Sequence, residues 1–226
     1  MKRHAILTGS SGGIGENIAC HLLELGWAVS GISRGKPGID HPHFTHLAWD
    51  LADSAMLIKR LHTLPRSHAF IHAAGVMIAG RLGELQHAQS DHLWQLHVHS
   101  VEILANHLVK SMQHGDRIIL IGSRTARGMA ERSQYTACKA AQLAMTRSWA
   151  AELAACGITV NLIAPGATRT AMLDAPDRRA SPPRLPPIGR YIEPHEISEC
   201  VAYLLSPAAA AITGQEICLC GGASLL

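Results

Sequence analysis

Two residues in the second half of the chain have the types and spacing needed for proton transfer. Tyr135 and Lys139 are four positions apart in a segment with a helical pattern, so their side chains should lie on one face, one turn apart. A phenol has a pKa of about 10 and is a poor base at neutral pH, but a neighbouring ammonium favours the phenolate and lowers that pKa. Tyr135 could then protonate a carbonyl oxygen or deprotonate an alcohol. The same spacing also occurs in ordinary pairs on helix surfaces.

A glycine-rich stretch, TGSSGGIG at residues 8–15, separates a strand-like run from a helix-like segment. Gly9, Gly13 and Gly15 would let the backbone turn tightly and approach a pyrophosphate. The helix that follows would offer free N–H groups and the positive end of its dipole. Ligands of parallel sheets bind beyond the carboxyl ends of the strands, where this stretch lies. It therefore predicts a dinucleotide site, although a glycine run alone could also be a flexible turn.

The end of the second strand-like run, SGISRG, bears on which dinucleotide is bound. An acidic residue here would bind the 2'-hydroxyl of the adenosine ribose and repel a 2'-phosphate. Ser33 is at this position and Arg34 follows it. A guanidinium with a hydroxyl beside it suits a phosphate, which favours NADP(H) over NAD(H). The alternative is that Arg34 faces solvent and the protein binds NAD.

Strand-like and helix-like segments alternate along the 226 residues. We expect short apolar strands at residues 3–8, 27–33, 44–49, 68–73, 116–122, 157–163 and 215–219, and helices at 13–25, 53–63, 88–113, 133–155 and 194–205. Asp53 or Ser54 would cap the second helix. The alternation predicts an α/β fold with a doubly wound, mostly parallel sheet that has helices on both faces. Because no internal repeat or linker is visible, residues 1–226 are expected to form a single domain.

Taken in order, these features resemble the short-chain dehydrogenase/reductase family over nearly all of the chain. The motifs that carry the resemblance are TGSSGGIG at 8–15, WDL at 49–51, HAAG at 72–75, YTACK at 135–139, APGATRT at 164–170 and TGQEICLCGG at 213–222. The resemblance implies a Rossmann fold with sheet order 3-2-1-4-5-6-7 and catalysis by Tyr135 and Lys139. Ser123, at the end of the fifth strand, would hydrogen-bond the substrate oxygen.

The resemblance also implies which residues contact the cofactor. Asp50 would contact the adenine, Lys139 would hold the nicotinamide ribose, and the APGATRT stretch would lie on the nicotinamide side. The residues expected to bind the cofactor are Gly9, Ser11, Gly13, Ile14, Gly15, Ser33, Arg34, Asp50, Leu51, Ala74, Gly75, Tyr135, Lys139, Pro165, Gly166, Thr168 and Thr170.

The chain departs from the family pattern in its middle helix, where family members usually carry a catalytic Asn just after a valine. In WQLHVHSVEIL, His99 is at that place. An imidazole can also hold water and carry protons, so His99 could replace the Asn in a proton relay. It could equally be a packing residue in a slower enzyme. His72 and Ala73 replace two further family residues, but that loop contacts the cofactor mainly through its backbone.

Residues 171–190, AMLDAPDRRASPPRLPPIGR, are the one break in composition, with five prolines and four arginines. This segment lacks helical periodicity, is short for the family, and is expected to be a loop within the domain that covers the substrate. Its apolar side would be formed by Met172, Leu173 and Leu185. Its arginines could attract an acidic substrate or could simply be solvated; they are Arg178, Arg179, Arg184 and Arg190.

The composition limits the classes of function. A hydrophobic content of 47% and a mean hydropathy of +0.11 indicate a globular protein, and a net charge of +3 without a basic stripe argues against nucleic acid. No stretch reaches the roughly 18 apolar residues of a membrane span, so we expect a soluble, cytoplasmic protein.

The cysteines and histidines show no metal-ligand spacing. Cys138, Cys156 and Cys200 are expected to be small buried residues, and Cys218 and Cys220 to point to the same side of the last strand. The cluster formed by His41, His43 and His46 has no cysteine or carboxylate at a ligand spacing, so no metal site is expected.

Together these observations predict an NADPH-dependent carbonyl reductase, similar to 3-oxoacyl-carrier-protein reductases and their broad-specificity relatives. Its substrate would be a small carbonyl or alcohol compound, with a thioester among the candidates. Two alternatives stay open: a cofactor-binding regulatory protein with little turnover, and an NAD-linked alcohol or sugar dehydrogenase, against which Arg34 argues. The apolar, alanine-rich helices at 88–113 and 133–155 would suit the homotetramer that family members commonly form.

Overall fold

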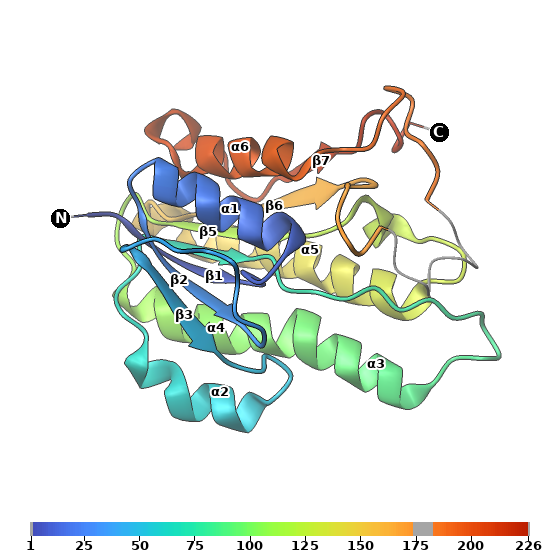
Figure 1. The fold of residues 1–226 in the computed structure, drawn as a ribbon, viewed down its shortest axis with the longest axis horizontal. Helices are drawn as coiled ribbons and strands as arrows, with labels where there is room; N and C mark the ends of the chain where they lie inside the picture. Colours follow the sequence, from blue (N-terminus) through green and yellow to red (C-terminus); the bar gives the residue numbers. More distant parts are fainter. Residues whose placement is uncertain (1, 174–182, 226) are drawn as a thin grey trace.

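The computed structural model describes residues 2–173 and 183–225, and its centre is one seven-stranded sheet (Figure 1). Every pair of neighbouring strands is parallel, in the order β3-β2-β1-β4-β5-β6-β7. This confirms the predicted doubly wound sheet and its order. The strands are β1 (His4–Thr8), β2 (Ala28–Ser33), β3 (Phe44–Ala48), β4 (Ala69–His72), β5 (Arg117–Ile121), β6 (Thr159–Pro165) and β7 (Glu216–Leu219).

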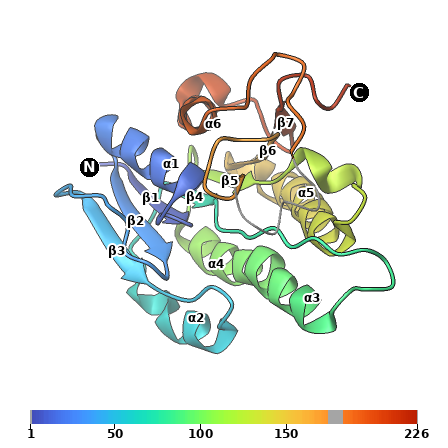
Figure 2. The same cartoon turned by 45° about the vertical axis from the view of Figure 1, so that its right-hand side comes forward.

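Both faces of the sheet are buried, because successive side chains of a strand point to opposite faces. Leu7 packs on one face, against α1 (Gly13–Glu24) and α6 (Pro194–Leu205). Ile6 packs on the other face, in the cluster that includes α2 (Ser54–Arg60), α4 (Ser100–Leu108) and α5 (Ser133–Leu153). Figure 2 shows these two groups of helices on opposite sides of the strands. Burial on both faces explains why the inner strands β1, β4, β5 and β6 are mainly apolar.

The segment expected to be one helix over 88–113 consists of several parts. α3 (His87–Trp94) is followed by a π-helical turn (Gln95–His99), by α4 and by a 3-10 turn (Val109–Ser111). In the π turn the N–H of Ser100 bonds to the carbonyl oxygen of Gln95, five residues earlier. A π turn holds one more residue than an α turn, so it changes the direction in which nearby side chains point. The predicted helical stretch is therefore confirmed in its extent, and the π turn within it is a feature that the sequence analysis did not predict.

Local hydrogen bonds set the helix ends. Asp53 Oδ1 accepts from the N–H of Met56 at 2.9 Å, so Asp53 rather than Ser54 caps α2. α2 ends at Arg60 and continues as a 3-10 turn (Leu61–Thr63). The long helix α5 likewise ends in a 3-10 turn (Ala154–Cys156).

The six cysteines are unpaired, and their burial corrects part of the expectation. Cys138 is buried and Cys200 half-buried, but Cys156 is exposed because it lies in the turn after α5. Cys218 is exposed whereas Cys220 is buried, so the expectation that they share one side is wrong. The physical reason is that β7 ends at Leu219, before the strand alternation reaches Cys220. Within the described residues no group of His, Cys, Asp or Glu is placed to hold a metal ion.

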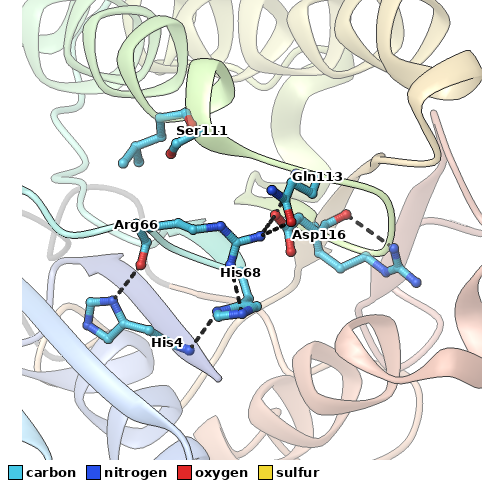
Figure 3. Close-up of polar contacts among 8 residues, drawn as sticks. His4, Arg66, His68, Ser111, Gln113 and Asp116 are labelled. Atoms are coloured by element: carbon cyan, nitrogen blue, oxygen red, sulfur yellow. Dashed lines mark hydrogen bonds and ion pairs between the residues drawn. The ribbon is translucent and has the colours of Figure 1, made fainter. Parts of the chain in front are cut away.

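A polar network joins the amino-terminal ends of the central strands (Figure 3). Arg66 Nη2 and the backbone N–H of Gln113 both donate to Asp116 Oδ2, at 3.2 and 2.7 Å. Arg66 Nη1 lies 2.8 Å from His68 Nε2, and the backbone N–H of His4 donates to His68 Nδ1 at 3.1 Å. These contacts fix the starts of β1, β4 and β5 at the end of the sheet opposite to the one where parallel strands bind ligands. No helix among residues 2–173 and 183–225 is long and apolar enough to cross a membrane.

Candidate active site

The loop between β1 and α1 packs backbone against backbone, which requires glycine. Gly9 has a φ of 77°, and a Cβ there would lie 2.7 Å from the backbone nitrogen of Ala74. A Cβ on Gly15 would overlap the carbonyl oxygen of Gly9. No side chain caps the first turn of α1 at Gly12, so its N–H groups remain available for an anion.

A cavity of about 330 Å³ lies beside this loop, at the carboxyl ends of β1 and β2. Its lining brings together residues from separate parts of the chain. The predicted cofactor-binding residues found there are Gly9, Ser11, Gly13, Ile14, Gly15, Ser33, Arg34, Asp50, Leu51, Ala74, Gly75 and Thr170. Its glycine loop and free helix N-terminus fit the phosphates of a dinucleotide, so the residues present fit the cofactor that the sequence implies.

Ser33 and Arg34 differ in how they face this cavity. The Ser33 hydroxyl donates to the carbonyl oxygen of Gly35 at 2.8 Å and lies 3.1 Å from both Ser10 Oγ and His46 Nε2. It is therefore buried and engaged in shaping the turn after β2. Arg34 is exposed, and the ion pairs found among the described residues do not include it. The charge available to a 2'-phosphate at this end is the guanidinium of Arg34.

A larger cavity of about 660 Å³ adjoins the first and shares Ile14, Ala74 and Thr170 with it. It holds the three residues that the sequence assigns to catalysis by its motifs, namely Ser123, Tyr135 and Lys139. The remaining predicted cofactor-binding residues, Pro165, Gly166 and Thr168, also line it.

Lys139 is buried in the wall of this cavity, close to Tyr135. Its Nζ lies 5.8 Å from the centre of the Tyr135 ring, as expected for a pair one helical turn apart. The ammonium donates to the carbonyl oxygen of Ile121 at 2.9 Å and to Gln142 Oε1 at 3.0 Å. Burial lowers the pKa of Lys139 to about 7, because desolvation disfavours the charged form.

Ser123 is positioned by the turn that follows β5. Its extended backbone caps the 3-10 turn Arg124–Arg127, and its Oγ accepts from the N–H of Thr125 at 3.2 Å. The hydroxyls of Ser123 and Thr125 are 2.8 Å apart. Thr125 therefore orients the Ser123 hydroxyl, a role for which the sequence showed no motif.

The middle-helix histidine that lines the site is His97, whereas His99, the histidine considered for a proton relay, lines neither cavity. The His99 side chain is 46% exposed and lies 3.9 Å from the Glu102 carboxylate, away from both cavities. His97 is fully buried, lines the larger cavity and meets Tyr135 edge to face with ring centres 5.6 Å apart. Its Nε2 lies 2.9 Å from the carbonyl oxygen of Val76.

His97 and His99 both belong to the π turn but are two residues apart, so their side chains point in different directions and the ring of His97 is the one that enters the cavity. Gly75 is the residue in the sequence that relates to the position of His97, because a Cβ on Gly75 would lie 2.5 Å from His97 Cε1. A glycine after β4 thus makes room for the ring of a residue on the middle helix.

Both imidazoles near Lys139 are held in the neutral form. Burial, followed by the nearby charge of Lys139, lowers the pKa of His72 to about 3 and the pKa of His97 well below its usual value. His72 Nδ1 lies 2.9 Å from Thr8 Oγ1, and the same hydroxyl accepts from the N–H of Ala74 at 3.2 Å. Through the Thr8 hydroxyl, His72 therefore stabilises the loop after β4.

The loop at 171–190 contributes to the larger cavity on both sides of residues 174–182, which lie outside the described part together with Arg178 and Arg179. Leu173 is buried there, and Met172, Arg184 and Leu185 also line the cavity. Arg190 instead donates to both Glu196 carboxylate oxygens, at 2.7 and 2.9 Å. Arg124 was not predicted but also lines the cavity.

Comparison with known proteins gives matches over almost the whole chain. Residues 9–224 match the family model described as enoyl-(acyl carrier protein) reductase. The chain is 30% identical to a 3-oxoacyl-(acyl-carrier-protein) reductase of Vibrio harveyi over 96% of each protein, and 32% identical to carbonyl reductase family member 4 of Danio rerio over all of both. A short chain dehydrogenase family protein of Francisella tularensis has the same fold, with a TM-score of 0.92 at 23% identity over all of both chains.

Proposed function

The chain belongs to the short-chain dehydrogenase/reductase family, and we propose that it is an NADPH-dependent reductase that converts a carbonyl to an alcohol. The observation that carries the proposal is that Ser123, Tyr135 and Lys139 line one cavity, with the ammonium of Lys139 buried beside the Tyr135 ring. Carbonyl reduction also agrees with the oxidoreductase names of the relatives.

The three side chains have distinct roles in this reaction. The cofactor, when bound, supplies a hydride for the carbonyl carbon. Tyr135 gives its phenolic proton to the carbonyl oxygen, and the Ser123 hydroxyl donates a hydrogen bond to the same oxygen. Lys139 in its charged form stabilises the resulting phenolate. Hydride and proton together convert C=O to CH–OH.

Arg34 supports NADP(H) as the cofactor. It lines the smaller cavity at the end of β2, where the adenosine ribose of a dinucleotide would lie. A guanidinium can form two charge-assisted hydrogen bonds with a phosphate, and no carboxylate of the described residues pairs with it.

The lining of the larger cavity supports an acyl thioester or a related carbonyl compound as substrate. Met172, Leu173 and Leu185 contribute apolar side chains to the lining, and Arg124 and Arg184 contribute positive charge. The Vibrio relative is named for a 3-oxoacyl substrate carried on an acyl carrier protein, and an acyl chain of this kind would suit the apolar part of the lining.

Assembly and location complete the proposal. The protein is proposed to be cytoplasmic. Its assembly as a homotetramer is supported by the surface of the long helices, where Trp94 leaves 40% of its surface exposed and α5 exposes Ala137, Ala140 and Ala144. Light scattering tests the assembly, and a mass equal to one chain would contradict it.

The reaction is tested by following NADPH oxidation with a panel of 3-oxoacyl thioesters, diketones, quinones and keto sugars. We expect turnover with at least one class and its loss in Tyr135→Phe, which keeps the ring but removes the acid. Turnover that survives in Tyr135→Phe would contradict the assigned mechanism. NADPH binding without turnover on any class would favour the regulatory alternative, and oxidation of alcohols with NAD would favour the dehydrogenase alternative.

A further inference from the structure

A fully buried amide, Gln142, connects Lys139 to the π turn. Gln142 lies three residues after Lys139 on α5, so the two side chains share a face of the helix. Lys139 Nζ donates to Gln142 Oε1 at 3.0 Å, and Gln142 Nε2 donates to the carbonyl oxygen of His97 at 2.8 Å. Because an ammonium only donates and a carbonyl only accepts, the amide is held in one orientation.

The acceptor at the far end of this link is a backbone group of the π turn. Such turns shift the backbone hydrogen bonds by one residue and are frequent at functional sites. Here the carbonyl oxygen of His97 receives a side-chain N–H from another helix. Gln142 therefore ties α5 to the turn that places the His97 ring against Tyr135.

The groups that face Lys139 give its charge little compensation. His72 on β4 and His97 in the π turn are both kept neutral by their lowered pKa values, and Tyr135 and Cys138 are its neighbours on α5. The ion pairs found within residues 2–173 and 183–225 do not include Lys139. Its burial without a carboxylate is consistent with the lowered pKa.

The charged form of Lys139 is thus stabilised by dipoles, namely the carbonyl of Ile121 and the amide of Gln142. The Ile121 carbonyl belongs to the end of β5, so a side-chain substitution cannot remove it. The Gln142 amide is the part of this arrangement that substitution can alter. A hydrogen bond to a charged group is worth roughly twice a neutral one, so its loss should be measurable.

We propose that Gln142 is a positioning residue for Lys139, holding the ammonium in place and favouring its charged form through the amide oxygen. The inference rests on the proposed function, in which a charged Lys139 assists Tyr135. It adds a residue outside the Tyr-Lys motif that acts only through Lys139. The two contacts explain why position 142 holds a glutamine: its side chain must accept a hydrogen bond from Lys139 and donate one to the carbonyl oxygen of His97.

Two substitutions at Gln142 should change the stability of the charged form of Lys139 in opposite directions. Gln142→Met keeps an unbranched side chain of similar length but lacks the strong acceptor, so the charged form of Lys139 becomes less favourable. Gln142→Glu places a carboxylate beside the ammonium, which makes the charged form more favourable. Thr146→Val is the matched control: it removes a buried hydrogen bond one turn further along α5, from Thr146 Oγ1 to the carbonyl oxygen of Gln142, without removing the amide.

The protonation of Lys139 can be followed directly by NMR of protein labelled with ¹³C at the lysine ε-carbons. The chain has five lysines, and the other four are exposed. The Lys139 signal is identified by its absence in Lys139→Met. We expect its titration midpoint to fall by about one to two pH units in Gln142→Met, to rise in Gln142→Glu, and to stay at the unsubstituted value in Thr146→Val. The alkaline limb of the pH–rate profile should move in the same directions.

An unchanged midpoint in folded Gln142→Met would overturn the proposal. If Gln142→Met does not fold, a midpoint in Gln142→Glu that stays constant or falls would overturn it equally. A Lys139 midpoint that falls in Gln142→Met and rises in Gln142→Glu would support the proposal, because a general loosening of the core would not shift it in opposite directions. Because the NMR titration needs neither substrate nor cofactor, absence of turnover on every carbonyl would refute only the reductase proposal and leave this result readable.

Discussion

Replacing Gly75 by alanine tests how closely the loop after β4 is fitted to the π turn. A Cβ on Gly75 would lie 2.5 Å from His97 Cε1, whereas carbon atoms in contact are about 3.5–4.0 Å apart. The ring would therefore have to move by about 1 Å or more. His97 is fully buried and its Nε2 is 2.9 Å from the Val76 carbonyl oxygen, so a movement of this size disrupts that contact.

The expected cost follows from these two effects. Inserting a methyl group into a well-packed region costs about 1–3 kcal/mol, and losing a buried hydrogen bond costs about 1 kcal/mol. We expect Gly75→Ala to lower the free energy of unfolding by about 2–4 kcal/mol in urea titrations without cofactor. Gly38→Ala is the matched control, because Gly38 is exposed and a Cβ there would lie at an ordinary contact distance, 3.7 Å from Glu16 Oε1. It should change stability by less than about 0.5 kcal/mol.

A double-mutant cycle separates this clash from any other effect of the methyl group. In a His97→Ala background the ring is absent, so adding Gly75→Ala should cost little, and the coupling between the two sites should reach about 2 kcal/mol. Additive costs would show that the methyl group does not meet the ring. A Gly75→Ala variant as stable as the unsubstituted protein would refute the reasoning outright.

Three further predictions concern other parts of the molecule. Arg34→Asp should lower the NADPH-to-NADH preference at least tenfold, measured by cofactor titration, whereas Lys36→Asp, with the same charge change outside the cavity, should not. His72 has a pKa of about 3 in the fold, so protonation of the unfolded chain below about pH 6.5 favours unfolding. Protonation of His72 in the unfolded chain should lower the free energy of unfolding by about 2 kcal/mol at pH 5. In His72→Asn, urea unfolding at pH 7 and at pH 5 should show a loss of stability that is smaller by this amount. Asp53→Ala removes the N-cap of α2 and should cost about 1 kcal/mol, and an unchanged unfolding midpoint would contradict the capping role.

The sheet could be predicted from the sequence because its signals are local. The inner strands are short apolar runs, and a run such as Ala5-Ile6-Leu7 is apolar at every position since both faces are covered. The glycine loop at 8–15 is local as well. The residues of the family motifs meet at one end of the sheet for the same reason, since parallel strands bring their carboxyl ends together.

What the sequence did not predict depends on contacts between distant segments. His97 and His99 are two residues apart, and the contact that distinguishes them is between the His97 ring and Tyr135 on another helix. The hydrogen bond from Gln142 to the His97 carbonyl spans 45 residues, so no periodicity within one helix reveals it. Ser33 was expected to face a phosphate, but its hydroxyl is engaged with Gly35 and neighbouring side chains after the turn has formed.

The burial of Lys139 itself argues for chemistry rather than packing. A pKa lowered from 10.5 to about 7 means that the fold disfavours the ammonium by roughly 5 kcal/mol relative to the unfolded chain. An apolar side chain of similar size would avoid that cost, at the expense of leaving the Ile121 carbonyl and the Gln142 amide with one partner fewer. We therefore expect Lys139→Met to be no less stable at pH 7 while it loses turnover. A large loss of stability in that variant would instead show that the ammonium is a structural element of the core.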